Sequence, residues 1–188
     1  IKFFWGYAIN KETNALIYNY VPGQQGVIPP LDDGEVYKIF EKISENNFLL
    51  AIHAENNELI SMLTKRVNAS GRDDYEALLE ARPALAEALT IQTAISFSQA
   101  TGAHLHVLHV TSKMGVDLIR RAKAENINVT AETCTHYLFL SDKDYGKIGT
   151  GMKVYPPIKR EIDRLALWEG LKDGTIDYVS SDHAPHAV

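Results

Sequence analysis

Cysteine is nearly absent from this 188-residue chain, which contains Cys134 alone. A single cysteine excludes an internal disulfide framework and a metal site made only of thiolates. The scarcity of cysteine is also typical of a reducing compartment, so we predict a cytoplasmic protein. Any metal site must then use nitrogen and oxygen ligands, which the seven histidines and 24 acidic residues can provide.

Long apolar runs and clusters of positive charge are absent as well. No stretch approaches the roughly 20 consecutive apolar residues that a membrane-spanning helix needs. The formal net charge is -5, and no stripe of lysine and arginine interrupts the sequence. We therefore expect neither nucleic acid nor a membrane as a partner. With 45% hydrophobic and 23% charged residues, the composition is that of a globular domain.

Short apolar runs alternate with longer segments of helical period. The apolar runs predict strands at Ile1–Trp5, Phe48–Ala54, His104–Val110, Asn128–Cys134 and Tyr178–Asp182. Their near-continuous hydrophobicity is typical of a parallel sheet buried on both faces. The segments between them predict helices at Asp33–Glu45, Pro83–Ala100, Ser112–Asn126 and Lys159–Lys172. This alternation predicts an α/β fold with right-handed crossovers.

Five strands are too few for a closed eight-stranded barrel, which typically needs about 250 residues. Two segments, Gly6–Leu31 and Glu55–Arg82, are long for loops between a strand and a helix, so we expect lids or binding loops there. The chain opens within an apolar run at Ile1 and stops at Val188, just after a histidine-rich turn. We therefore expect residues 1–188 to be an interior part of a single larger barrel domain.

Side chains that can bind metals fall in or at the ends of the predicted strands. Lys2 lies in the first strand, and His53, His109 and Asp182 close the second, third and fifth. In a parallel α/β barrel the carboxyl ends of the strands converge on the face that carries the active site, so these four side chains could meet. Taken singly, each has a structural explanation, such as a hydrogen-bonded histidine or a lysine at a frayed chain start.

Three histidines compete for a role in the third predicted strand. Alternation along a strand sends His109 to the same face as Leu105 and Val107. His104 and His106 then share the opposite face. We therefore expect His109, and not the other two, to be the ligand.

The turn after the fifth strand, Ser181-Asp182-His183-Ala184-Pro185-His186, contains an acid and two imidazoles. One alternative is an Asx-type turn with surface histidines. A Ser-His-Asp hydrolase is another, but it would need a Gly-x-Ser-x-Gly elbow, which this sequence lacks. Cys134 is a further candidate nucleophile, although its place within an apolar strand favours a packing role.

Seven stretches distributed over almost the whole chain match one family in that family's order. They are Lys2-Phe3-Phe4-Trp5-Gly6-Tyr7, His53-Ala54-Glu55-Asn56, Ala81-Arg82-Pro83, His109-Val110-Thr111-Ser112, Glu132-Thr133-Cys134-Thr135-His136-Tyr137-Leu138, Pro156-Pro157-Ile158-Lys159 and Ser181-Asp182-His183-Ala184-Pro185-His186. The chain thus resembles the cyclic amidohydrolases, which include hydantoinase/dihydropyrimidinase, dihydroorotase and allantoinase.

This resemblance implies part of a TIM-type (β/α)8 amidohydrolase barrel, with strands 4–8 present and strands 1–3 missing. It implies two divalent metal ions, usually zinc, held by Lys2, His53, His109 and Asp182. Lys2 would be carbamylated by carbon dioxide. The implied reaction is ring opening of a cyclic amide by metal-bound hydroxide. A homo-oligomer, dimer or tetramer, is expected for the full-length protein.

The resemblance also implies roles in the chemistry. Asp182 would carry a proton to the departing ring nitrogen, and Tyr7 would donate to the developing oxyanion, unless Tyr7 only packs at the barrel mouth. The stretch from Phe3 to Tyr7 favours a hydantoinase or dihydropyrimidinase. His186 instead resembles the dihydroorotase histidine that meets the substrate carboxylate, and Tyr155 stands at a substrate-binding position where asparagine or serine is usual.

Several functions remain open at this point. Dihydroorotase and allantoinase activities are alternatives within the family. A non-catalytic dihydropyrimidinase-like scaffold is an alternative of another class. Because the His-x-His pair after strand 1 is missing, we expect the isolated fragment to be inactive.

Overall fold

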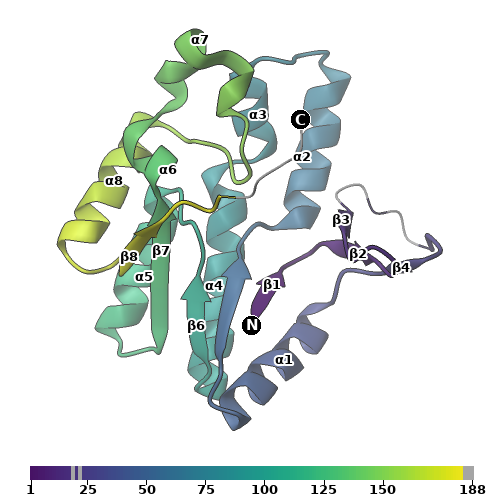
Figure 1. The fold of residues 1–188 in the computed structure, drawn as a ribbon, viewed down its shortest axis with the longest axis vertical. Helices are drawn as coiled ribbons and strands as arrows, with labels where there is room; N and C mark the ends of the chain where they lie inside the picture. The colour runs from purple at the N-terminus through teal and green to yellow at the C-terminus, as the bar shows by residue number, and fades with distance from the viewer. Residues whose placement is uncertain (18–19, 21–22, 184–188) are drawn as a thin grey trace.

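The computed structural model describes residues 1–17, 20 and 23–183. Its centre is a five-stranded sheet of order β1-β5-β6-β7-β8, in which all four pairings are parallel. The strands are β1 (Lys2–Phe4), β5 (Leu49–His53), β6 (His104–Val107), β7 (Val129–Cys134) and β8 (Tyr178–Ser180). Neighbouring strands follow one another in chain order, with helices between them (Figure 1). The predicted α/β class and partial barrel are confirmed.

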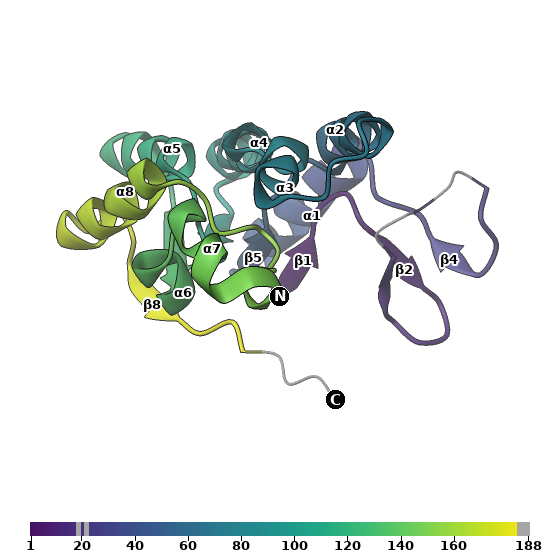
Figure 2. The ribbon, with the colours of Figure 1, turned by 90° about the horizontal axis from the view of Figure 1, so that it is seen from above.

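Four long helices occupy the segments that the sequence predicted. They are α1 (Asp33–Glu45), α4 (Ala84–Thr101), α5 (Lys113–Ala124) and α8 (Glu161–Lys172). Seen from above, α1, α4 and α5 lie along one side of the sheet (Figure 2). A capping box fixes the start of α1. The Asp32 side chain accepts from the Glu35 backbone N–H, and the Glu35 side chain accepts from the Asp32 backbone N–H.

This reciprocal cap gives a first prediction. Asp32→Ala should lower the free energy of unfolding of the full-length protein by about 1 kcal/mol, because a helix N–H loses its acceptor. Urea denaturation measures the change. Asp33→Ala is the matched control, since Asp33 lies in the first turn of the same helix without acting as the cap. An equal loss in both variants would contradict a specific capping role for Asp32.

The two faces of the main sheet differ in burial. Side chains facing the helices form the core, and those of Leu50, Ile52, Leu105, Val107 and Ala131 are fully buried. The strand register aligns the alternate residues in a second row on the other face, namely Lys2, Ala51, His106 and Thr130. In that row Lys2 is exposed and Ala51 and Thr130 are half-buried. The charged and polar side chains of the strands therefore share the more open face.

The segment Gly6–Leu31, expected as a loop, contains a small antiparallel sheet of order β3-β2-β4. Its strands are β2 (Ala8–Asn10), β3 (Leu16–Ile17) and β4 (Val27–Ile28). Strands of two or three residues are too short to produce a recognisable alternation of apolar and polar residues. The turn between β2 and β3 is held by Asn10, whose side chain accepts from the backbone N–H groups of Glu12 and Thr13.

The segment Glu55–Arg82, also expected as a loop, is mostly helical. It contains α2 (Asn57–Ala69) and α3 (Tyr75–Ala81), capped by Asn56 and Asp74. Of the residues in α2 only Ile60 and Val67 are buried, so the apolar face of this helix is narrow and hard to recognise in the sequence.

The remaining elements follow β7 and lie near its carboxyl end (Figure 1). They are α6 (Thr135–Phe139), the 3-10 turns Asp142–Asp144 and Gly149–Met152, and α7 (Tyr145–Ile148) between them. Within the described residues, no helix combines the length and apolar character required to cross a membrane.

Candidate active site

Two buried histidines meet at the carboxyl ends of β5 and β6. His53 Nδ1 lies 3.0 Å from His109 Nε2, and the two rings are arranged edge to face. Strand β6 ends at Val107, earlier than the sequence predicted, and His109 has a positive φ of 38°. The expected alternation was therefore wrong at His109, because the backbone turns after Val107 and directs the ring toward His53.

The hydrogen bonds around His53 determine the protonation of both rings. Glu55 Oε2 lies 3.1 Å from His53 Nε2, and since a carboxylate only accepts, that nitrogen must carry the proton. In the tautomer that this contact selects, His53 Nδ1 carries the lone pair and accepts from His109 Nε2. Burial, with a contribution from His53, lowers the pKa of His109 to about 3, so His109 is neutral and its Nδ1 also bears a lone pair.

This lone pair on His109 has no hydrogen-bond partner although the atom is buried. An unpaired buried acceptor is unfavourable unless something else occupies it. Neutral imidazole nitrogens are the ligands that zinc and similar divalent cations take in proteins. The histidine pair therefore fits the chemistry of a metal ligand set.

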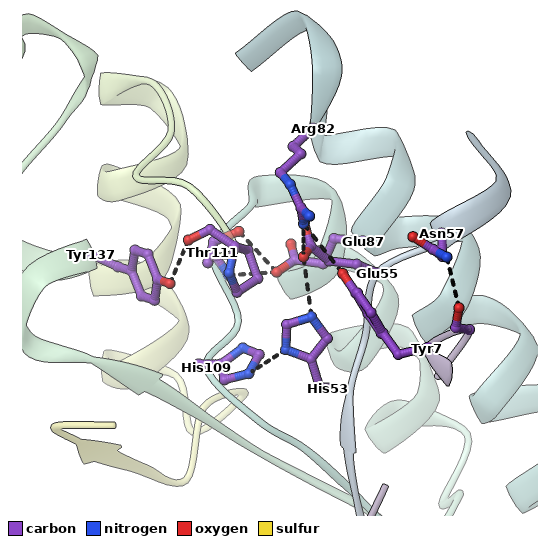
Figure 3. A network of polar contacts seen from close by, with 11 residues as sticks. Tyr7, His53, Glu55, Asn57, Arg82, Glu87, His109, Thr111 and Tyr137 are labelled. Carbon is purple, nitrogen blue, oxygen red and sulfur yellow. Dashed lines mark hydrogen bonds and ion pairs between the residues drawn. The ribbon is translucent and has the colours of Figure 1, made fainter. Parts of the chain in front are cut away.

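A charged network supports the histidine pair from one side (Figure 3). Arg82 Nη1 donates to Glu55 Oε2 at 2.5 Å and lies 3.4 Å from the Tyr7 hydroxyl. Burial alone would raise the pKa of Glu55, but the hydrogen bond from His53 and the charge of Arg82 outweigh it and lower the pKa. Glu55 is therefore ionised and holds the proton on His53 Nε2.

A second buried carboxylate supports the loop that carries His109. Glu87 accepts from the Thr111 backbone N–H at 2.8 Å, from the Thr111 hydroxyl at 2.9 Å and from the Ser112 hydroxyl. Burial raises the pKa of Glu87, whereas burial lowers the pKa of Lys159. Each of the two groups opposes the effect of burial on the other. Glu87 thus fixes the two residues that follow Val110 and, with them, the turn at His109.

Lys2 and Asp182 have different relations to the histidine pair. The Lys2 ammonium lies 4.8 Å from the centre of the Phe4 ring, which in turn packs against the His53 ring. Its charge also contributes to lowering the pKa of His109. Asp182 is exposed, with a positive φ of 44°, and strand β8 ends before it at Ser180.

The charge of Asp182 is felt by His136, whose pKa is lowered by burial and raised by this carboxylate. Among the described residues, no hydrogen bond or ion pair joins Asp182 to His53 or His109. In the same part of the chain, no three side chains of histidine, cysteine, aspartate or glutamate are arranged to hold a metal ion together. The structure thus brings together His53 and His109 directly, with Lys2 close by, and leaves Asp182 at the His136 end.

The other residues singled out from the sequence have distinct surroundings. The Tyr7 side chain is buried, and its ring packs edge-on against His53. The Tyr155 ring lies 4.0 Å from the Arg82 guanidinium carbon, and both residues line a cavity of about 920 Å³ beside α2 and α3. Cys134 is fully buried, and burial raises its pKa to about 11, which makes it a poor nucleophile. His186 lies outside the described residues.

Sequence reasoning assigned no role to Glu55, Arg82, Glu87 or Lys159, all of which are buried. Glu55 and Arg82 belong to stretches that matched the family, and their charge within such stretches was a usable signal. Glu87 lies among apolar residues of α4, where a lone acid is easily taken for a residue on the solvent-facing side of a helix.

Comparisons with known proteins place this chain among enzymes that act on cyclic amides. No family model matches the chain. It is 38% identical over 157 residues to an allantoinase of Deinococcus radiodurans, covering 84% of this chain and 35% of that protein. It is 36% identical over 194 residues to a dihydroorotase of Lactobacillus gasseri, covering 98% of this chain and 45% of that protein.

Solved structures include similar proteins of the same kind. The L-hydantoinase (dihydropyrimidinase) from Arthrobacter aurescens superposes with a TM-score of 0.81 at 36% identity, covering 89% of this chain and 37% of that one. The chain thus spans about a third to a half of the length of these relatives.

Proposed function

Since this chain is homologous to one part of the cyclic amidohydrolases, we propose that the complete protein hydrolyses the ring amide bond of a cyclic amide. Hydantoin- and dihydropyrimidine-type rings are the first substrates to test. One observation carries the proposal: two buried imidazoles lie in contact at the carboxyl ends of parallel strands, and a buried nitrogen of one has no hydrogen-bond partner. Active sites of parallel α/β barrels form at these strand ends.

Four residues of this chain would hold two divalent metal ions, zinc first. They are His53, His109, Asp182 and Lys2, the last as the carbamate that it forms with carbon dioxide. When bound, such a pair of metal ions acidifies a water molecule and polarises the carbonyl under attack. Carbamylation needs the neutral amine as the group that reacts with carbon dioxide.

The remaining steps belong to side chains of the protein. Asp182 would take the proton of the attacking water and deliver it to the ring nitrogen as the C–N bond breaks. Asp182 is exposed and, among the described residues, has no hydrogen bond to the histidine pair, so its carboxylate can turn from the attacking water to the ring nitrogen. Tyr7 would donate to the oxygen that gains negative charge, a contribution typically worth about 2.7–4 kcal/mol.

Metal removal tests the proposal. Dialysis of the full-length protein against a chelator should remove the ring-opening activity, and added Zn²⁺ should restore it, because ligand sets of this kind act only when loaded. Ultraviolet absorbance follows the opening of dihydrouracil, hydantoin, dihydroorotate and allantoin in parallel assays. The proposal would be refuted if the protein, as isolated, contained no metal and opened none of the four rings. That result would favour a non-catalytic scaffold protein.

The substrate panel also separates the alternatives within the family. Preference for hydantoin or dihydrouracil is expected from the Phe3–Tyr7 stretch. His186→Ala provides the discriminating variant, because a histidine that meets a substrate carboxylate should matter only for dihydroorotate. A preference for dihydroorotate that this variant abolishes would reassign the substrate while leaving the reaction class intact.

A further inference from the structure

Arg82 is the point at which three parts of the site meet. It caps the carboxyl end of α3, and its side chain is 9% exposed. One guanidinium nitrogen, Nη1, reaches both Glu55 and the Tyr7 hydroxyl, and the Tyr155 ring lies against the guanidinium plane. Figure 3 shows Arg82 directed from α3 toward Glu55 and Tyr7, with His53 beyond them. A buried arginine of this kind is costly to desolvate, so its contacts determine what it does.

We propose that Arg82 is a positioning residue that holds the metal-ligand side and the oxyanion side of the site in one arrangement, through Glu55 on His53 and directly on Tyr7. The inference rests on the proposed function, because it assigns Arg82 to the same reaction. It assigns no contact between Arg82 and substrate.

Arg82 acts on His53 through Glu55. The Glu55 Oε2 atom accepts from both Arg82 and His53, so the position of this oxygen depends on both partners. A carboxylate on the outer nitrogen of a histidine selects the tautomer and ring orientation with which the histidine binds a metal. Loss of Arg82 would remove the guanidinium that donates to Glu55 Oε2, and the hold of Glu55 on His53 would weaken.

Arg82 also contacts the Tyr7 hydroxyl directly. Arg82 has only donors, so the Tyr7 hydroxyl must accept in that contact. A hydroxyl that accepts from a cation is polarised and becomes a stronger donor. The Tyr155 ring lies over the Arg82 guanidinium and helps to hold its orientation. The ammonium group of a lysine would not stack on the ring in this way. Arg82 therefore prepares Tyr7 for the oxygen that gains charge during ring opening.

The test is a double-mutant cycle in the full-length protein. Arg82→Lys alone should lower kcat about 10- to 100-fold, the range for residues that support metal ligands, with a smaller change in KM. In a Tyr7→Phe background the same replacement should have a smaller effect on kcat, since one of its targets is already gone. Arg82→Lys alone should also speed the loss of bound metal. In a Glu55→Gln background, Arg82→Lys should cause no further increase in the rate of metal loss. Arg72→Ala is the matched control, because Arg72 is an exposed, ion-paired arginine beside α3.

Chemical rescue separates positioning from a purely structural role. Arg82 lines the cavity of about 920 Å³, so a small guanidinium ion has a route to the vacated position in Arg82→Ala. Millimolar methylguanidinium should raise kcat of Arg82→Ala several-fold and leave Tyr7→Phe unchanged. Fully additive effects of Arg82→Lys in both backgrounds, or metal loss from Arg82→Ala at the wild-type rate, would overturn the inference. Failure of the proposed function would look different, because the wild-type protein itself would open none of the rings.

Discussion

Replacing His109 with alanine in the full-length protein should lower kcat/KM by more than about 100-fold, beyond the usual loss when a residue that merely supports a metal ligand is removed. The reason lies in the geometry of the histidine pair. His109 contributes the nitrogen that touches His53 and a second, buried nitrogen that has no hydrogen-bond partner. Metal content should fall together with activity, since a ligand set that loses a nitrogen donor binds its ion more weakly.

His104→Ala is the matched control for this experiment. His104 belongs to the same β6 region, is half-buried, and has a hydrogen-bond partner of its own in the Thr130 hydroxyl. Its replacement should leave metal content and kcat/KM within a few-fold of wild type. Metal analysis by mass spectrometry and the ultraviolet assay provide the two measurements. Equal losses in both variants would mean that histidines of this strand act through stability, and His109 would lose its assigned role.

Glu87→Ala should destabilise the full-length protein by about 3–5 kcal/mol, because three buried donors would lose their acceptor and each unsatisfied buried group costs about 1–3 kcal/mol. The Glu87 side chain is 2% exposed, and it accepts from the Thr111 amide and from the hydroxyls of Thr111 and Ser112. Without it, three donors lose their acceptor, and the buried Lys159 loses one of the carboxyl groups that oppose the effect of burial on its pKa.

Two further variants make this result specific. Glu87→Gln keeps the size of the side chain and one acceptor, so its loss of stability should be smaller than that of alanine. Glu80→Ala, at an exposed acid of α3 paired with Arg72, should change stability by less than about 1 kcal/mol. Urea denaturation followed by circular dichroism gives the comparison. If Glu87→Ala matched Glu80→Ala, the buried carboxylate would not be needed to hold the loop behind His109.

Glu87 and Arg82 were not predicted as site residues because nothing in their local sequence indicates that they are buried. A glutamate in a helix and an arginine before a proline are ordinary features of exposed surfaces. Their burial follows from the way α3 and α4 pack beside the ends of β5 and β6, which periodicity within one segment cannot encode. The two long segments expected as loops were misjudged for a related reason, since short strands and a helix with two buried residues carry weak patterns.

By itself, the sequence determined the order of the five main-sheet strands and the four long helices, because near-continuous apolar runs and helical spacing are local properties of neighbouring residues. It also identified the histidines and the lysine, because a small set of residue types can bind metals and they recur at strand ends. Only the tertiary structure decided which of these side chains touch. The direction of His109 depends on a backbone turn after Val107, and the contacts of His53 with His109 and of Glu55 with Arg82 join segments separated by tens of residues. Contacts of that kind depend on packing between elements, and no single stretch of the chain contains them.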